Sequence, residues 1–251
     1  MTQILGLDVG GSGIKGALVD LETGQMTTDR FRVKTPQPAT PEAVAAAAAA
    51  VVEHFRYKGP LGVGFPAPLK HRPLRSMANL DKSWVGKDPA ALIAKATGQP
   101  TSVLNDADAA ALGEARFGGG KGRQGILLFL TLGTGIGSAL LHDGRLVEHT
   151  ELGHLYLENG MTCEQYAAES ARDRAGLSFK EWGKRLHVVL REYQKLFWPD
   201  AIVLGGGGAK KWDKMAEFVE IETPIVLAEL RNNAGIIGAA VHAHECSGAE
   251  G

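Results

Sequence analysis

Short apolar runs of strand length alternate along this chain with longer, alanine-rich segments of helical length. Two of the apolar runs, at 4–9 and 127–132, each end in a glycine-rich turn that leads into a second strand. Short apolar runs bounded by turn residues are typical of buried strands, so both runs are predicted to be central strands. The pattern therefore favours an α/β fold built around two strand–turn–strand units.

The N-terminal half is predicted to be a sheet followed by helices. Thr40 is expected to cap a helix whose first residue is Pro41, because proline has no N–H to lose there. Three prolines make the stretch before it an extended linker. The predicted strands are 4–9, 14–20, 28–34, 62–65 and 101–104; the predicted helices are 42–57, 89–98 and 107–117; 66–88 is expected to be a loop and 35–41 the linker.

The second half repeats the order of hairpin, glycine turn and helix, which predicts an internal duplication. The triple glycine at 118–120 ends the preceding helix and is the expected hinge. Residues after 245 are expected to be a disordered tail. The predicted elements are strand, turn and strand over 126–147, one long helical stretch at about 161–197, strands at 201–204 and 225–228, a four-glycine turn at 205–208 and a helix at 233–244.

The two glycine turns have the composition of phosphate-binding loops. Backbone N–H groups hold phosphate in such loops, and glycine permits both the close approach and positive φ angles. Asp8 and Lys15 flank the first turn, whereas Thr131, Thr134 and Ser138 bring hydroxyl groups to the second. Neither turn is a Walker loop or a Rossmann fingerprint. Two halves are expected to close on one phosphate chain, with plain tight loops as the alternative.

Bulk properties narrow the class of protein. The 251 residues are 44% hydrophobic, which is enough for a sizeable core, and the formal net charge is -1. Nucleic-acid binding usually needs a basic balance or stripe, and the sequence has neither. Two distant cysteines, Cys163 and Cys246, give no disulfide framework. No secretory signal and no apolar run of about 20 residues is present, so a cytoplasmic protein without membrane contact is expected.

Five motifs occur in an order that resembles the ROK sugar kinases over nearly the whole chain. The resemblance implies an actin-like (ribonuclease-H-like) ATPase fold of two α/β domains flanking a cleft. The domains would be 1–117, with a helix at about 235–245 packed back on it, and 118–234, in a homodimer. The motifs are Asp8-Val9-Gly10-Gly11, Asn105-Asp106-Ala107, Leu132-Gly133-Thr134-Gly135-Ile136-Gly137, Glu151-Leu152-Gly153-His154 and Leu204-Gly205-Gly206-Gly207.

Within that family, the long first turn and the stretches 35–41 and 79–84 resemble the polyphosphate glucokinases. This implies an enzyme that moves the terminal phosphate of inorganic polyphosphate, and in some members of ATP, to the 6-hydroxyl of glucose with Mg²⁺. One alternative is a strictly ATP-dependent glucokinase or hexokinase with adenosine at 205–208 and Trp212 as a wall. A remoter one is a sugar-sensing regulator, but the first strand begins at Ile4 and leaves no room for a DNA-binding module.

The resemblance implies that Asp106 is the general base, which accepts the proton of the sugar hydroxyl. From the residues alone, Asn105, Asp106 and Asp108 could instead cap the helix that follows. Glu158 and Glu169 are alternatives to Glu164, because the family places this glutamate after a zinc cluster that this chain lacks, and Asp81 is a further candidate. The glucose ligands implied by the family are Asn79, Asn105, Asp106, Glu151, His154 and Glu164.

The donor phosphates are expected to meet both turns and the later glycine-rich segment. Asp8 would hold Mg²⁺, directly or through water. Tetrahedral structural zinc needs four ligands, and His154 and Cys163 supply two, so no zinc is predicted. The implied donor residues are Asp8, Gly10, Gly11, Ser12, Lys15, Thr131, Gly133, Thr134, Gly135, Gly137, Gly206, Gly207, Lys210 and Lys211; Lys214, Arg72, Arg75, Lys121 and Arg123 are further candidates for the path of the polymer.

Overall fold

The computed structural model describes residues 2–70 and 73–248 of the chain. The chain divides into two compact units. The first unit combines Met1–Phe117 with Asn232–Gly251, and the second comprises Gly118–Arg231. Arg72, one of the candidates for the polymer path, lies outside the described residues.

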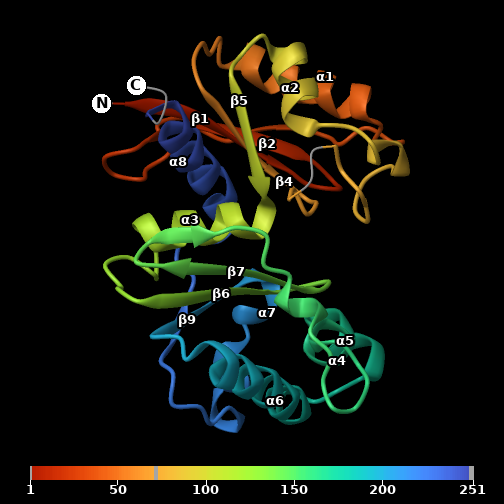
Figure 1. Ribbon diagram of the computed structural model, residues 1–251, viewed down its shortest axis with the longest axis vertical. Helices are drawn as coiled ribbons and strands as arrows, with labels where there is room; N and C mark the ends of the chain where they lie inside the picture. Colours follow the sequence, from red (N-terminus) through yellow and green to blue (C-terminus); the bar gives the residue numbers. More distant parts are fainter. Residues whose placement is uncertain (1, 71–72, 249–251) are drawn as a thin grey trace. The chain divides into compact units, whose positions relative to one another are not determined.

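The first unit contains a five-stranded sheet in the order β3-β2-β1-β4-β5 (Figure 1). Its first three strands are antiparallel, whereas β4 and β5 run parallel to β1. The strands are β1 (Gln3–Val9), β2 (Ile14–Asp20), β3 (Phe31–Val33), β4 (Leu61–Phe65) and β5 (Thr101–Asn105), and the helices are α1 (Pro41–His54), η1 (Lys82–Trp84), α2 (Pro89–Thr97), α3 (Asp106–Phe117) and α8 (Ala234–Gly248), with the short turn η5 (Arg231–Asn233) before α8.

Alternation along β1 explains how helices cover this sheet. Leu5 and Leu7 are buried in a core that includes Val44 and Val51 of α1. Gly6 faces the other way, and a Cβ there would collide with the backbone carbonyl of Ile236 in α8. Thr40 caps α1 by accepting from Ala43 N at 3.3 Å, as predicted. The pattern of leucine and glycine along one strand therefore places apolar side chains on one face and a close helix backbone on the other.

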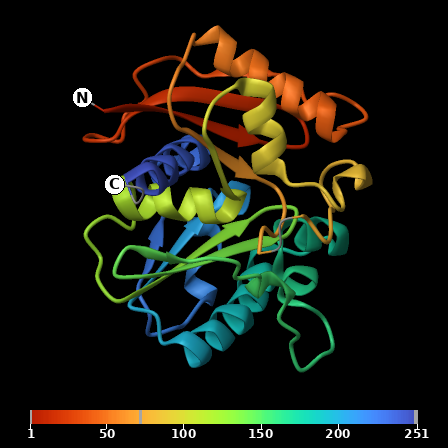
Figure 2. The ribbon, with the colours of Figure 1, turned by 45° about the horizontal axis from the view of Figure 1, so that its top comes forward.

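Helix α8 packs closely against β4 and α3 because glycines lie at the points of contact. A Cβ at Gly62 of β4 would meet the carbonyl of Ala239, and a Cβ at Gly238 would meet the carbonyl of Ala109 in α3. Figures 1 and 2 both show α8 alongside α3 within this unit. Backbones can approach this closely only where side chains are missing, so these glycines are required by packing.

The second unit repeats the first in strand order and direction. Its sheet runs β10-β9-β6-β7-β8, with an antiparallel β6–β7–β8 meander and β9 and β10 parallel to β6. The predicted internal duplication is therefore confirmed. The strands are β6 (Ile126–Leu132), β7 (Ile136–His142), β8 (Arg145–Val147), β9 (Ala201–Gly205) and β10 (Ile225–Leu227), and the helices are η2 (Leu152–His154), α4 (Cys163–Ala167), α5 (Glu169–Ala175), α6 (Phe179–Phe197), α7 (Gly206–Ala209), η3 (Trp212–Lys214) and η4 (Ala216–Phe218).

The single helical stretch predicted at about 161–197 is wrong, because the segment forms three helices. Ala168 is extended and Gly176 is left-handed, with φ 61°, so each interrupts the helical path. Thr162 and Ser178 begin α4 and α6 with capping boxes. These two boxes were a local signal in the sequence that the prediction overlooked.

Other predicted elements also differ from the structure in extent or type. Strand β3 begins at Phe31 rather than Thr28. Helix α8 continues through Cys246 to Gly248, so the tail predicted from Cys246 is wrong over those residues, and 249–251 lie outside the described part. Gly206–Ala209 forms one helical turn in place of the predicted glycine turn. No helix in the described ranges is long and apolar enough to cross a bilayer.

The close packing at Gly62 predicts that adding one methyl group there destabilises the protein strongly. Gly62→Ala should lower the free energy of unfolding by about 3 kcal/mol, because the new Cβ meets backbone that cannot rotate away. Gly248→Ala is the matched control, since a Cβ there meets no atom within 4 Å. Urea denaturation measures both. Equal stability of the Gly62→Ala protein and the unsubstituted protein would contradict this account of α8.

Candidate functional site

The first glycine turn joins β1 to β2 and is flanked by one acidic and one basic residue. Asp8 and Lys15 are partners in the antiparallel register. Lys15 Nζ lies 3.4 Å from Asp8 Oδ2, and their side chains are 30% and 24% exposed. The pair places a carboxylate and an ammonium group, both partly exposed, at the base of the turn.

Other segments bind the carbonyl groups of this turn and leave its N–H groups available. Gly10 N donates to Gly13 O at 3.1 Å across the turn. The exposed N–H groups of Gly11 and Ser12 meet no acceptor among residues 2–70 and 73–248. A turn with satisfied carbonyls and open N–H groups favours an anion. The side-chain donors to its carbonyls are Thr35 Oγ1 to Gly10 O at 2.5 Å, Arg32 Nη2 to Ser12 O at 2.9 Å and Gln37 Nε2 to Gly11 O at 3.4 Å.

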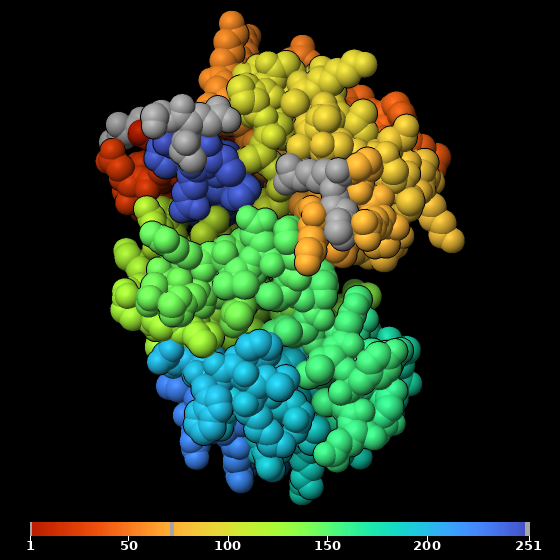
Figure 3. All heavy atoms as spheres, in the orientation of Figure 1, coloured from red at the N-terminus to blue at the C-terminus, as the bar shows by residue number. Residues whose placement is uncertain are grey.

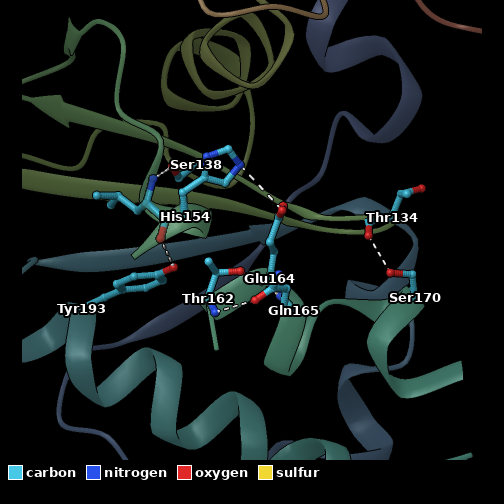
Figure 4. A network of polar contacts seen from close by, with 9 residues as sticks. Thr134, Ser138, His154, Thr162, Glu164, Gln165, Ser170 and Tyr193 are labelled. Atoms are coloured by element: carbon cyan, nitrogen blue, oxygen red, sulfur yellow. Dashed lines mark hydrogen bonds and ion pairs between the residues drawn. The ribbon is translucent and has the colours of Figure 1, made fainter. Parts of the chain in front are cut away.

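The second glycine turn, between β6 and β7, also has bound carbonyl groups and open N–H groups. Gly133 N donates to Gly135 O at 3.0 Å. Ser170, on α5, donates its N–H to Gly133 O at 3.1 Å and its hydroxyl to Thr134 O at 2.6 Å (Figure 4). Within the part of the chain that the structure describes, the N–H groups of Thr134 and Gly135 have no acceptor. Sequence reasoning missed Ser170, because it lies 36 positions from Thr134.

Two expectations for these turns are wrong. The glycines of both turns have ordinary negative φ angles, and among the predicted donor residues the positive φ, 82°, belongs to Gly206. Ser138 is buried, and its hydroxyl is bound to backbone groups at 150–152 rather than open to a phosphate. Thr131 and Gly137 are cross-strand partners within the sheet. Glycine in these turns therefore permits other groups to approach the backbone closely and is not needed for a positive φ angle.

Asn105 and Asp106 lie where β5 ends and α3 begins. Asn105 Oδ1 accepts from Ala107 N at 2.8 Å and from Asp108 N at 3.3 Å, so the capping alternative is confirmed for this residue. Asp106 is exposed, and its Oδ1 accepts from Ala107 N at 2.9 Å, whereas Asp108 is 2% exposed. The end of a parallel strand thus presents the Asp106 carboxylate to solvent, where α/β folds place ligands.

Glu151, His154 and Glu164 lie close to one another in the second unit, and Figure 4 shows His154 and Glu164 pointing toward each other. His154 Nε2 is 3.6 Å from Glu164 Oε1, and a Cβ on Gly135 would lie 2.5 Å from Glu164 Oε2. The residue Glu151 is exposed, yet partial burial of its carboxyl raises its pKa, with the charge of Glu164 adding to the rise and His154 opposing it. Glu164 therefore lies beside both the second turn and His154.

The two alternative glutamates lie elsewhere. Glu169 Oε1 accepts from Lys211 Nζ at 2.6 Å, and Glu158 is exposed in the loop before α4. This ion pair also neutralises Lys211, whereas Lys210 is exposed. Of these three glutamates, the geometry favours Glu164 as the partner of Glu151 and His154.

The remaining predicted residues occupy loops or packing positions. Asn79 is exposed, and its carbonyl lies 3.5 Å from the position of a Cβ on Gly11, so it borders the first turn. Asp81 caps η1, and hydrogen bonds from Ser83 lower its pKa. The loop 73–88 lies at the surface of the first unit (Figure 3, orange to yellow). Trp212 packs against the core of the second unit. The further polymer-path candidates that are exposed are Arg75, Lys121, Arg123 and Lys214.

Cys163 is a core residue. It is fully buried, and burial raises the pKa of its thiol. Among the described residues, no three His, Cys, Asp or Glu side chains are grouped so as to hold a metal ion. A single carboxylate such as Asp8 beside open N–H groups nevertheless fits Mg²⁺, which takes most of its ligands from substrate phosphates and water.

Comparison with known proteins agrees with this geometry. The model of the ROK family matches residues 4–166. The chain is 48% identical to a polyphosphate glucokinase from Mycobacterium tuberculosis over 94% of this chain and 89% of that protein. It is 45% identical to an inorganic polyphosphate/ATP-glucomannokinase from Arthrobacter sp. strain KM, whose crystal structure superposes with TM-score 0.89 over 98% of this chain and all of that one.

A second solved structure has the same fold at lower identity. The ROK family glucokinase from Streptomyces griseus, solved in complex with glucose and AMPPNP, is 24% identical and has a TM-score of 0.77 over 97% of this chain and 100% of that one. The expected α/β fold is thereby confirmed as the actin-like ATPase fold of the ROK sugar kinases. The matched family model and the relatives of nearly full length together show that the chain belongs to the ROK family.

Proposed function

We propose that this protein is a polyphosphate-dependent glucokinase that also accepts ATP. It transfers the terminal phosphate of the donor to the 6-hydroxyl of glucose and releases glucose 6-phosphate. The observation that carries the proposal is the exposed Asp106 carboxylate at the junction of β5 and α3. Support comes from the polyphosphate glucokinase and the polyphosphate/ATP-glucomannokinase to which the chain is 48% and 45% identical.

Asp106 serves as the general base in this proposal. A sugar hydroxyl is a weak nucleophile, so its proton must leave as the new oxygen–phosphorus bond forms. The proton passes to the Asp106 carboxylate, while the phosphorus–oxygen bond to the rest of the donor breaks. Ala107 N fixes one carboxylate oxygen, and Asn105 fixes the first turn of α3 on which the carboxylate sits.

In the first unit, Asn105, at the end of β5, is a proposed ligand of the sugar hydroxyls. Asn105 Nδ2 donates to Ala67 O at 3.3 Å and has a second N–H for a sugar oxygen. In the second unit, Glu151 and Glu164 offer acceptors, and His154 offers a ring nitrogen. Asn79 is a further ligand in this proposal. The pKa of Glu151 is raised, so this carboxyl ionises at higher pH than an exposed glutamate does.

In each unit, the open N–H groups of the glycine turn are the proposed ligands of donor phosphate. Asp8 holds Mg²⁺, which neutralises phosphate charge when bound, and Lys15 adds a second cation. Of the adjacent lysines Lys210 and Lys211, Lys210 is the better candidate for the polymer path, because Lys211 forms an ion pair with Glu169. The homodimer stays a prediction from the family resemblance, and the cytoplasmic location stays a prediction from the sequence. The remaining donor residues of the proposal are Gly10, Gly11, Ser12, Thr131, Gly133, Thr134, Gly135, Gly137, Gly206 and Gly207.

The first test measures glucose 6-phosphate formation by the purified protein with glucose and Mg²⁺. Nucleotide-free polyphosphate and ATP are compared at equal phosphate concentration. The proposal predicts turnover with both donors and faster turnover with polyphosphate. Turnover with ATP alone would move the function to an ATP-dependent glucokinase, and no turnover with either donor would reject a glucokinase altogether.

Asp106→Asn tests the proposed base. The amide keeps the size of the carboxyl but cannot take a proton, so kcat should fall by about a thousandfold while glucose still binds. Steady-state kinetics and calorimetric glucose binding separate the two effects. Asp88→Asn is the matched control, because Asp88 also accepts an N–H at a helix start, from Ala90 at 2.9 Å in α2. Near-normal turnover of the Asp106→Asn protein would exclude Asp106 as the base.

A further inference from the structure

The turn that carries Glu151 and His154 lies directly on the backbone of β7. A Cβ at Gly153, in the middle of the turn, would collide with the carbonyl of Ile136. Ile136 is the first residue of β7 and follows the second glycine turn. The proposed sugar ligands and the proposed donor turn are therefore attached to the same end of one strand.

Ser138, two residues further along β7, binds backbone groups on both sides of Glu151. Its Oγ accepts from Leu152 N at 2.8 Å and donates to Thr150 O at 3.0 Å. The side chain is buried, at 4% exposure, so neither bond is exchanged easily for water. One buried hydroxyl thus fixes the chain before and after a proposed sugar ligand.

Tyr193, on α6, binds the same turn from another side. Its Oη donates to Leu152 O at 2.8 Å, and the residue is fully buried. Burial raises the pKa of Tyr193 well above its ordinary value, so the hydroxyl keeps its proton and remains a donor. Both backbone polar groups of Leu152 are therefore held by side-chain hydroxyls.

Leu152 and Leu155 also pack against the core of the second unit, and Cys163 N donates to Leu155 O at 2.9 Å, but the turn itself is short. It is a three-residue 3₁₀ turn, and Glu151, at its N-cap, makes no side-chain capping bond. Its own backbone bonds are His154 N to Glu151 O at 3.1 Å and Leu155 N to Leu152 O at 3.0 Å. Glu151 and His154 are both exposed, so core packing does not hold their side chains directly, and their directions follow the backbone of the turn.

We propose that Ser138 and Tyr193 are positioning residues for glucose, because they fix the Leu152 backbone and with it the directions of Glu151 and His154. The inference rests on the proposed glucokinase function, since it takes Glu151 and His154 as sugar ligands. Neither hydroxyl contacts the sugar. Each acts by pre-ordering a turn that would otherwise lose conformational freedom when glucose binds.

Removing either hydroxyl should weaken glucose binding and leave the donor unaffected. In Ser138→Ala and Tyr193→Phe, the Kd for glucose, measured by calorimetry without donor, should rise about tenfold. The KM for polyphosphate should stay within about twofold of the unsubstituted value, because the donor turn keeps its bonds to Ser170. Ser138→Thr retains a hydroxyl and should restore most of the affinity lost in Ser138→Ala.

Tyr57→Phe is the matched control for Tyr193→Phe. Tyr57 also donates to a backbone carbonyl, Pro60 O at 2.9 Å, but it lies in the first unit after α1. The Tyr57→Phe protein should be less stable than the unsubstituted protein but should bind glucose with the same affinity. The inference is overturned if both Ser138→Ala and Tyr193→Phe bind glucose like the unsubstituted protein, or if donor KM rises as much as glucose Kd. Absence of glucose binding by the unsubstituted protein would instead reject the proposed function.

Discussion

The first unit depends on close contact between the backbone of α8 and the backbones of β1, β4 and α3. Carbonyl groups of α8 lie where side chains would stand on Gly6 of β1 and Gly62 of β4. A carbonyl group of α3 lies where a side chain would stand on Gly238 of α8. A helix from the C-terminal end of the chain thereby fixes α3, and the first residue of α3 is Asp106. Dense packing transmits small displacements, so the position of this carboxylate depends on glycines far from it in sequence.

The two glycine turns solve one problem in the same way. A turn can offer N–H groups to an anion only if its carbonyl groups are satisfied elsewhere or face away. In the first unit, the segment from Arg32 to Gln37 supplies the side-chain donors; in the second, Ser170 supplies a hydroxyl and an N–H. The duplicated sheets therefore carry duplicated anion-favouring turns, supported by different residues.

Features with a local signal were predictable from the sequence. The apolar runs of β1 and β6 and the Thr40–Pro41 start of α1 depend on neighbours within a few residues, and the structure has all three. A family motif marks Asn105 and Asp106 as candidate site residues, which stays a prediction, while the capping contact of Asn105 followed from ordinary helix chemistry.

Features that depend on distant contacts were not predictable. Ser138 was predicted to meet phosphate because it follows a glycine turn, but its partners at 150–152 come from a later loop. Lys211 was predicted to bind polymer, and its ion pair with Glu169 spans 42 positions. The glycine contacts of α8 give no periodic apolar signal, because the interacting groups are backbone atoms. In each case, the decisive contact joins segments that only the fold brings together.

The central claim is that Asp106 takes the proton of the glucose 6-hydroxyl. A crystal structure of the protein with glucose bound tests this most directly. The account predicts the 6-hydroxyl within about 3 Å of the Asp106 carboxylate, at hydrogen-bonding distance. A glucose molecule whose 6-hydroxyl meets another carboxylate and does not contact Asp106 would contradict it.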